Sequence, residues 1–387
     1  MVRIISRLNV GGPAIQAITL TRRLEPLGYD TTLIRGREDP DEGNMDYLAE
    51  ELGVKPVLVG WLRRNPGFHD ALALVSLVRR LRRARPDIVH THAAKAGTLG
   101  RAAALLAYRR GRRPILVHTF HGHSLSGYFS ERRNALYRRI ERFLARRTDR
   151  LIAVSDEVRD ELVALEVAEP ERFEVIPLGF DLGPFLVGEP ERTKGRAALR
   201  AEFGIAEDAT VVTLVARLAP IKRVDRFLSL ANRLSDAPDV AFVIVGDGEL
   251  RESLRSSATA GALAQRLVWA GFRRDMPDVY FASDVVVQTS DNEGTPVALI
   301  EAQAAGVPAV STAVGGVARA IIEGETGRVI PVGADDAMAS AIRRYLDDPE
   351  LRATHGARAR PHAERTFALD ALLSSLDRLY RNLLDRR

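Results

Sequence analysis

Short runs rich in Val, Ile and Leu recur along the whole chain, and they restrict its fold more than any other feature. They are too continuously apolar for strands with one side in water, and amphipathic stretches separate them, which is typical of buried parallel strands joined by helices. The first series consists of VRIIS, YDTTLI, PVLVGW, DIVHTH, ILVHTF, RLIAVS and FEVIPLG. The second consists of TVVTLVAR, VAFVIVGD, RLVWAGF, DVVVQTS, PAVSTAV and GRVIPV. The sequence therefore predicts an α/β fold with two facing Rossmann-like domains, each built on a parallel sheet.

A polar, charged passage from Val187 to Arg200 separates the two series. Because 387 residues exceed what one hydrophobic core usually holds, we expect two domains with a boundary near this passage. The predicted domains are 1–183 and 184–365, followed by a helix over 366–387 that packs back on the first domain. Open parallel sheets bind ligands beyond the carboxyl ends of their strands, so we expect the chemistry in the loops at those ends.

Composition narrows the class of protein. The chain has no cysteine, which excludes disulfides, thiolate metal sites and a cysteine nucleophile. The N-terminal stretch MVRIISRLNVGGP lacks the apolar run of a signal peptide, and no stretch of about 18 uncharged apolar residues occurs anywhere. We therefore expect a cytoplasmic protein.

The positive charge is concentrated in the first half of the chain. The net charge is +5, but residues 55–150 contain 22 Lys or Arg and only 5 Asp or Glu, so this region carries +17 and the rest −12. Such a field favours an anionic partner, which can be nucleic acid, a membrane surface or a phosphorylated substrate. The alternative is an arginine-rich face that simply contacts water.

The stretch DNEGTPVALIEAQAAGVP contains the signals of a helix start. Thr295 suits the N-cap and Pro296 the first helical position. We predict that this helix runs to Ala305 and ends before Gly306. Free amides at Gly294 and Thr295 and in the first turn would then bind an anion such as phosphate.

Two carboxylates flank this anion site. Glu293 and Glu301 are eight positions apart, so they cannot clamp one metal ion together, and each is expected to accept hydrogen bonds from hydroxyl groups. A nucleotide sugar meets that description, with its ribose toward Glu301 and its sugar toward Glu293. The alternative is that Glu293 is only a favourable charge near a helix start and Glu301 is a solvated residue.

Two further segments supply groups for a diphosphate. Arg217 follows a predicted strand and Lys222 lies in the next loop, which places two cations where a leaving diphosphate gains negative charge. The alternative is an exposed cationic loop.

Gly11 and Gly12 follow the first strand and allow a ligand to approach the backbone, so we expect them to contact the nucleotide sugar that would act as sugar donor. A bare tight turn is the alternative there, and the G-x-G-x-x-G pattern is absent.

Histidines cluster at the ends of two strands. HTFHGHS presents His118, His121 and His123, and HTH presents His90 and His92. Such clusters raise the hypothesis of a zinc site, but no carboxylate or cysteine completes a ligand set, so we predict no metal.

The triplet Asp39-Pro40-Asp41 superficially resembles an Asp-x-Asp metal motif. It lies in a polar, acidic loop and lacks the alternating ligands and glycine of a calcium loop. We interpret it as solvated surface.

Several of these segments together resemble a known family. The chain is similar, over nearly its whole length, to the retaining glycosyltransferases of family 4, which have the GT-B fold of two Rossmann-like domains. The segments that carry the resemblance are NEGTPVALIEAQAAGVPAVST, VARLAPIKRVD, VGDGE, NVGGPAIQA and THAAKAG. The glutamate pair with the intervening helix start is the most specific of them.

The resemblance implies a function and residue roles. It implies transfer of a sugar from a nucleoside-diphosphate sugar, bound by the second domain, to a hydroxyl acceptor on the first, with retention and without a metal or cofactor. Arg217 and Lys222 would hold the diphosphate, Glu293 would act at the sugar, and His121 would line the sugar site. Pro296 would lie at the donor, whereas Lys95 and His92 would lie at the acceptor, although Lys95 can instead be a solvated residue.

The stretch RRNALYRRIERFLARR suggests where the acceptor is met. Four apolar residues follow helical spacing there while arginines occupy another face, which suits a helix on an anionic membrane surface, peripheral on the inner face of the plasma membrane. The apolar residues are Leu136, Ile140, Phe143 and Leu144. A polyprenyl-diphosphate-linked sugar would suit both the surface and the charge, in the synthesis of cell-surface glycans, and nucleic acid is not the expected partner. The alternative is that the four apolar residues face the protein core.

Two other functions remain open at this stage. A sugar-nucleotide epimerase or hydrolase of the same fold would turn over the donor without an acceptor. A non-catalytic binding protein would use the basic region as a docking surface, although the presence of Glu293, Arg217 and Lys222 argues against it.

Overall fold

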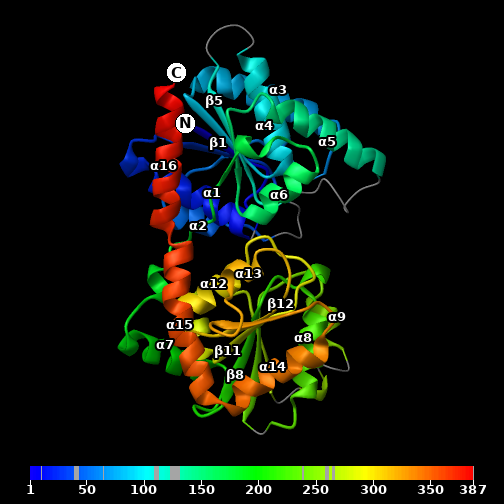
Figure 1. Ribbon diagram of the computed structural model, residues 1–387, viewed down its shortest axis with the longest axis vertical. Coiled ribbons are helices and arrows are strands. Elements are labelled where there is room, and N and C mark those ends of the chain that lie inside the picture. The colour runs from blue at the N-terminus through cyan, green and yellow to red at the C-terminus, as the bar shows by residue number, and fades with distance from the viewer. Residues whose placement is uncertain are drawn as a thin grey trace. The chain divides into compact units, whose positions relative to one another are not determined.

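A computed structural model describes most of the chain. The described residues are 1–9, 11–38, 43–63, 65–108, 113–122, 131–237, 239–257, 261–263 and 266–386. The chain divides into two compact units, each of which contains one parallel sheet covered by helices (Figure 1). Unit 1 comprises Met1–Phe180 and Leu369–Arg387, and unit 2 comprises Asp181–Ala368. The predicted α/β fold with two parallel sheets is confirmed.

Unit 1 has a seven-stranded sheet in the order β3-β2-β1-β4-β5-β6-β7, and every neighbouring pair is parallel. Each strand coincides with one of the apolar runs of the first series, because strands covered by helices on both faces are largely buried. The central strands β1, β4 and β5 are buried throughout, whereas the edge strand β3 is partly exposed. The strands are β1 (Val2–Ile5), β2 (Thr32–Arg35), β3 (Val57–Leu58), β4 (Ile88–His92), β5 (Ile115–Phe120), β6 (Arg150–Ala153) and β7 (Phe173–Val175).

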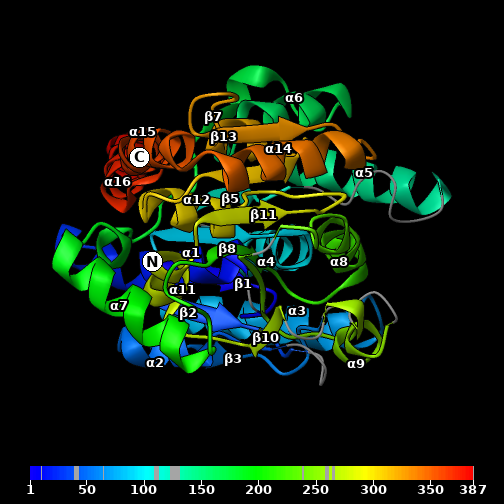
Figure 2. The ribbon, with the colours of Figure 1, turned by 90° about the horizontal axis from the view of Figure 1, so that it is seen from below.

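Alternate residues of these strands pack against two different groups of helices. Ile4, Val89 and Leu116 face α3 (His69–Ala84) and α4 (Ala94–Ala107). The same face also carries α5 (Glu131–Ala145) and α6 (Asp156–Ala164). Figure 2 shows α3, α4 and α5 following one another across it.

The opposite face of the sheet is covered by helices from both ends of the sequence. Ile88 and Val117 contact the apolar stripe of α16 (Leu369–Asp385), which is red in Figure 1. Beside it lie α1 (Gly12–Arg23) and α2 (Asp46–Glu51). The C-terminal helix is therefore part of the core of unit 1.

Unit 2 has a six-stranded parallel sheet in the order β10-β9-β8-β11-β12-β13. The strands again coincide with the predicted runs and are β8 (Thr210–Val215), β9 (Val240–Val245), β10 (Leu267–Gly271), β11 (Val285–Gln288), β12 (Ala309–Thr312) and β13 (Gly327–Ile330). One face carries α8 (Val224–Arg233), α9 (Arg251–Arg255) and α14 (Asp335–Asp347). The other carries α7 (Glu189–Glu202), α11 (Met276–Ala282), α12 (Val297–Ala304) and α15 (Pro349–Phe367).

Both strand orders reverse direction at one point. The reversal lies between β1 and β4 in unit 1 and between β8 and β11 in unit 2. Loops leave such a point in opposite directions and open a crevice at the carboxyl ends of the strands, where ligands bind in open parallel sheets. The segments that follow β8 and β11, and those that follow β1 and β4, are therefore the places to look for a site.

The expected single apolar face of α5 is only partly present. Leu136 and Phe143 are exposed, at 54% and 51%, but Leu144 is buried in the core of unit 1 and Ile140 is half-buried. The prediction that all four lie on one outer face is therefore wrong for Leu144, because a helix that covers a sheet must turn part of its apolar stripe inward. No helix within the described ranges is long and apolar enough to cross a bilayer.

Candidate functional site

The reversal point of unit 2 brings Lys222 and Glu293 into direct contact. Lys222 ends a short 3-10 turn after β8, and its Nζ lies 2.6 and 2.8 Å from the two carboxylate oxygens of Glu293. The hydroxyl of Ser290 donates to Oε1 of Glu293 at 2.6 Å. The Glu293 side chain is only 8% exposed, against 24% for Lys222. The carboxylate is thus largely removed from water and depends on these two donors.

Hydrogen bonds between the two loops fix this geometry. The hydroxyl of Thr289 donates to the carbonyls of Lys222 and Arg223 at 3.1 and 2.9 Å. The amide of Asp291 donates to the carbonyl of Ile221 at 2.9 Å. The loop after β11 is therefore bonded to the turn after β8 on both sides of the ion pair.

A glycine pair that the sequence pattern did not single out packs against the same loop. A Cβ at Gly315, whose φ is 49°, would lie 1.7 Å from the carbonyl oxygen of Glu293. The neighbouring Gly316 donates its amide to the carbonyl of Gly294 at 3.0 Å. Only glycine permits this close approach. The signal that was available is the Gly-Gly pair directly after the run PAVSTAV.

The helix after Glu293 begins one residue later than predicted. Pro296 is the N-cap of α12, with ψ at 78°, and no side chain caps the helix. The carbonyl of Thr295 instead accepts from the amide of Val297 at 3.0 Å, so a tight turn precedes the helix and Pro296 stays outside it. The prediction that Thr295 caps a helix from Pro296 to Ala305 is therefore wrong in register, because a local turn supplies the bond that a cap would supply.

Glu301 lies in α12 and is held by a tyrosine of α11. The hydroxyl of Tyr280, which is fully buried, donates to Oε2 of Glu301 at 3.0 Å. Burial raises the pKa of Glu301 to about 7, and the Tyr280 hydrogen bond opposes that rise. Glu301 is therefore a partly buried carboxylate with an assigned partner, and its alternative interpretation as a solvated residue is wrong.

Arg217 remains a free cation at the carboxyl end of β8. Its side chain is exposed, and the structure records no hydrogen bond or ion pair for it among the described residues. The loop around it is packed tightly, since a Cβ at Gly246 would lie 1.9 Å from the carbonyl oxygen of Ala216. Of the two cations predicted to meet a diphosphate, Arg217 is therefore unpaired among the described residues, whereas Lys222 is already paired with Glu293.

In unit 1 the histidines divide between the two faces of the sheet. His121 follows β5, and its Nε2 lies 3.1 Å from Nδ1 of His92. His90 contacts Tyr380 of α16, with 2.6 Å between Nδ1 and the hydroxyl. His118 faces α4 instead, and its Nδ1 lies 2.9 Å from the hydroxyl of Thr91. The sequence analysis assigned His121 to the sugar site and His92 to the acceptor, and the structure brings the two side chains into contact.

The other predicted residues of unit 1 lie at the starts of α1 and α4 or outside the described residues. Gly11 is the N-cap of α1 and Gly12 its first residue. Lys95 lies in the first turn of α4, but its Nζ is 2.7 Å from Asp70, so it is neither free nor simply solvated. His123 and Asp39–Asp41 lie outside the described residues. Within the part of the chain that is described, no group of three His, Cys, Asp or Glu side chains is arranged to hold a metal ion.

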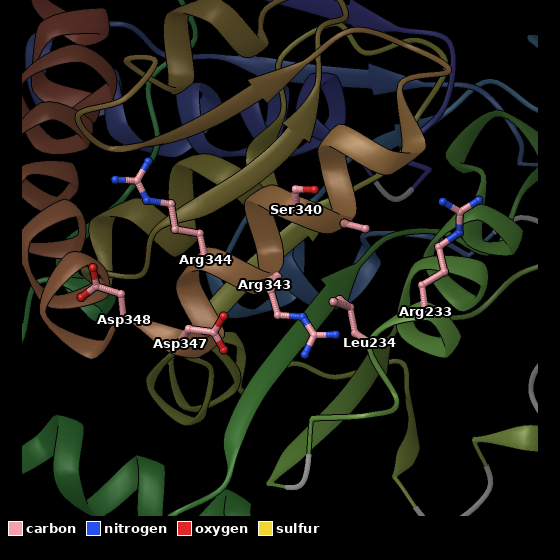
Figure 3. A pocket seen from close by; sticks show the side chains of 8 residues that line it. Arg233, Leu234, Ser340, Arg343, Arg344, Asp347 and Asp348 are labelled. Atoms are coloured by element: carbon pink, nitrogen blue, oxygen red, sulfur yellow. The ribbon is translucent and has the colours of Figure 1, made fainter.

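A surface cavity of about 440 Å³ in unit 2 contains none of these residues (Figure 3). Arg233 and Leu234 from the end of α8, and Ser340, Arg343 and Asp347 from α14, line it. Arg343 bonds Asp236, which precedes β9, so this cavity lies at the amino ends of the strands. It is therefore at the wrong edge of the sheet for the chemistry expected here.

Because Glu293 is more deeply buried than Lys222, we predict that the two partners of this ion pair contribute unequally to the stability of unit 2. Lys222→Ala leaves a buried carboxylate with Ser290 as its remaining donor and should destabilise unit 2 by about 1–3 kcal/mol. Glu293→Ala should cost clearly less, because the ammonium of Lys222 can turn to water. Urea unfolding followed by Trp269 fluorescence, in a Trp61→Phe background, reports on unit 2. The double variant should recover part of the Lys222→Ala loss, and equal losses in the two single variants would contradict the asymmetry.

The raised pKa of Glu301 makes a second prediction. The pKa of Glu301 is about 7 in the folded state and 4.5 ordinarily, so folding favours the protonated side chain. The stability that this protonated form contributes is fully present below about pH 4.5 and is lost as the pH rises through 7. Glu301→Gln should therefore stabilise unit 2 by on the order of 2 kcal/mol at about pH 8 and hardly at all near pH 4.5. The matched control is Glu325→Gln, which makes the same chemical change at an exposed position of the same unit. A pH-independent effect of Glu301→Gln would contradict the raised pKa of Glu301.

Comparison with known proteins now identifies the class. A model described as "Glycosyltransferase Family 4" matches residues 10–183, and one described as "Glycosyl transferases group 1" matches residues 195–362. The chain is 35% identical, over 79% of its length and 78% of the relative's, to UDP-Gal:alpha-D-GlcNAc-diphosphoundecaprenol alpha-1,3-galactosyltransferase of Escherichia coli. It is 30% identical, over 92% and 87%, to D-inositol 3-phosphate glycosyltransferase of Kribbella flavida.

Solved structures agree on the fold. Anabaena HepE in complex with UDP has a TM-score of 0.80 at 21% identity, with coverage of 98% of this chain and 99% of that one. Sucrose-phosphate synthase from Thermosynechococcus elongatus also has a TM-score of 0.80 at 21% identity, with coverage of 100% and 99%. These likenesses extend over both units and show the GT-B architecture that the sequence predicted. The chain therefore belongs to the group 1, family 4 glycosyltransferases and is itself a glycosyltransferase.

Proposed function

We propose that this glycosyltransferase is retaining and metal-independent and moves a sugar from a nucleoside-diphosphate sugar to a hydroxyl acceptor. The observation that carries the proposal is the Lys222–Glu293 pair at the reversal point between β8 and β11. A cation and a carboxylate held in contact there offer one group for a diphosphate and one for sugar hydroxyls. The family match supports the reaction class.

The donor is proposed to lie along the carboxyl edge of unit 2. Glu301 accepts from the ribose hydroxyls, and the amides of Gly294 and Thr295, with Arg217, meet the diphosphate. Glu293 is then nearest to the transferred sugar. A UDP-sugar is favoured, because UDP is the ligand in the Anabaena HepE structure and UDP-Gal is the donor in the name of the Escherichia coli relative.

Donor binding is proposed to rearrange the ion pair. In the free protein Lys222 and Glu293 neutralise each other. A diphosphate supplies Lys222 with a new anion, and Glu293 is then free to accept hydrogen bonds from sugar hydroxyls. The pair therefore keeps two charged groups in place and compensated until the substrate arrives.

The proposed step needs no protein nucleophile. The acceptor oxygen forms a bond to the anomeric carbon on the face from which the diphosphate leaves, and the bond from that carbon to the phosphate oxygen breaks with its electron pair. The leaving phosphate oxygen takes the proton of the acceptor hydroxyl. Arg217 and Lys222 stabilise the charge that develops on the diphosphate, so two cations and backbone amides do the work that a divalent ion does elsewhere.

The acceptor is proposed to bind unit 1 as a polyprenyl-diphosphate-linked sugar, in the synthesis of a cell-surface glycan. The name of the Escherichia coli relative states a diphosphoundecaprenol-linked acceptor. Lys95 and His92 lie at the carboxyl end of β4, where an acceptor would approach, and Gly11 and Gly12 lie after β1. Because Asp70 already holds Lys95, an acceptor phosphate would have to share that cation.

Unit 1 also offers a surface for an anionic membrane, at which this lipid-linked acceptor would be met on the cytoplasmic side. Exposed apolar side chains on α5 are accompanied by exposed Arg132, Arg139 and Arg146. On α3, Phe68 at the N-cap is 84% exposed, and Leu72 and Val75 continue its stripe toward an arginine-rich end. Apolar residues that insert beside arginines that meet lipid phosphates are the features of a helix that lies on a bilayer.

Arg217 gives the sharpest test of the proposed chemistry. Because the fold does not use its side chain, Arg217→Ala should leave stability unchanged and reduce kcat/KM for transfer by at least ~100-fold, about 3 kcal/mol of transition-state stabilisation. The matched control is Arg343→Ala, which removes the same charge from the amino edge of the same sheet and should leave the rate nearly unchanged.

The assay mixture contains EDTA and is run with and without acceptor. A folded Arg217→Ala variant with a near-normal rate would remove this residue from the mechanism. Activity that appears only with Mg²⁺ or Mn²⁺ would contradict metal independence. Donor turnover that does not depend on acceptor would favour a hydrolase or epimerase.

Liposome flotation tests the membrane surface. The full chain should float with anionic vesicles at low salt and less at high salt. Changing Arg132, Arg139 and Arg146 together to Gln should weaken binding by on the order of 100-fold, at about 1 kcal/mol for each charge. Arg142 is left in place because it bonds the C-terminal end of α6 through Leu165 and Glu166.

The control for flotation is a second triple variant with the same loss of charge. Arg233, Arg255 and Arg358 are exposed in unit 2 and are changed to Gln together. This variant should float like the original protein. Equal losses in both triple variants would indicate a general charge effect, and no flotation on any anionic vesicle would leave a soluble acceptor as the better proposal.

A further inference from the structure

A fully buried arginine lies beside the histidines of unit 1. Arg3 belongs to β1 and is 0% exposed, and its Nη1 lies 3.1 Å from Nε2 of His92. Within the described residues it has no ion pair with a carboxylate, and its Nε and Nη2 have no hydrogen-bond partner. Because a guanidinium only donates, Nε2 of His92 must accept this hydrogen bond. One arginine therefore determines which nitrogen of His92 carries the proton.

The same logic passes from His92 to His121. Burial lowers the pKa of His92 well below its ordinary value, so the ring is neutral and carries a single proton. Since Nε2 accepts, that proton is on Nδ1, which lies 3.1 Å from Nε2 of His121. His92 therefore donates, and His121 accepts at Nε2.

The geometry of the two rings fits such a hydrogen bond. The ring centroids of His92 and His121 are 5.4 Å apart and the planes differ by 29°. The centroid separation exceeds the 3.1 Å between the nitrogens by about two ring radii, so the rings meet edge to edge along the hydrogen bond. His90 stacks on His92 at 4.3 Å and is itself bonded to Tyr380 and Thr119, which fixes the His92 ring from the side.

His121 is left with one donor and no partner for it. Burial lowers the pKa of His121 to about 3, so its ring is also neutral, and with Nε2 accepting, its proton is on Nδ1. This Nδ1 is buried and has no hydrogen-bond partner in the described part of the chain. A buried donor without a protein partner is expected to bond a water molecule or a ligand.

We propose that Arg3 and His92 are positioning residues that fix His121 as an Nδ1–H donor to an oxygen of the bound sugar. The proposal rests on the proposed function and adds a restriction to it. Nε2 of His121 is occupied by the proton of His92, and Nδ1 carries a proton, so neither nitrogen has a free lone pair. His121 therefore cannot take the proton of the acceptor hydroxyl, which is left to the phosphate oxygen of the leaving group.

Nitrogen-15 NMR of the full chain labelled in its histidine rings tests the tautomers without any substrate. The rings of His92 and His121, assigned from the His92→Asn and His121→Asn variants, should both be neutral with the proton on Nδ1. Arg3→Lys, which also only donates, should keep this state, whereas Arg3→Met should give mixed tautomers. A proton on Nε2 of His121 in the unaltered protein would overturn the proposal, whether or not Arg3→Met folds.

Kinetics test whether the tautomer matters for transfer. Arg3→Met should lower kcat by about tenfold, the rate equivalent of one hydrogen bond, with little change in donor KM, and Arg3→Lys should restore most of it. His121→Asn, which can still donate, should retain more activity than His121→Leu. Equal rates in Arg3→Lys and Arg3→Met would overturn the positioning role. If no transfer occurs at all, the proposed function fails while the NMR result still decides the tautomer.

Discussion

The buried carboxylate of Glu293 is the constraint on which the arrangement of unit 2 depends. A carboxylate removed from water needs donors, and Lys222 and Ser290 supply them from two different loops. Hydrogen bonds from Thr289 and Asp291 hold these two loops together, so that the donors stay in place. The glycine at 315 lets a third loop approach them. The charged groups of the site are thus held by the same contacts that hold the loops of the fold.

The two units place opposite kinds of polar group at their reversal points. Unit 2 presents full charges, with Arg217 free and Lys222 paired, which suits a diphosphate. Unit 1 presents neutral histidines, because burial lowers the pKa of His92 and His121, and it orients them with one buried cation, Arg3. Under the proposed function, the charges of unit 2 suit a leaving diphosphate, and the oriented neutral donors of unit 1 suit sugar hydroxyls.

The strongly basic character of unit 1 has two separate uses. Some arginines are structural: Arg101 and Glu141 form a buried pair that joins α4 to α5, and Arg113 binds Asp149 ahead of β6. Others, such as Arg132 and Arg139, remain exposed on α5. The +17 of residues 55–150 therefore overstates the charge available to a partner, and only the exposed arginines enter the proposed membrane surface.

The sequence by itself determined the strands, the fold class and the identity of most candidate residues, because burial of parallel strands and the chemistry of helix starts are local patterns. It did not determine that Lys222 contacts Glu293, that a turn displaces Pro296 from α12, or that Tyr280 holds Glu301. The sequence also did not single out Arg3, which is one basic residue within the apolar run VRIIS. These features depend on which strands become neighbours and which way each side chain points, and only the tertiary structure decides that, since residues far apart in the sequence meet only after the sheet has formed.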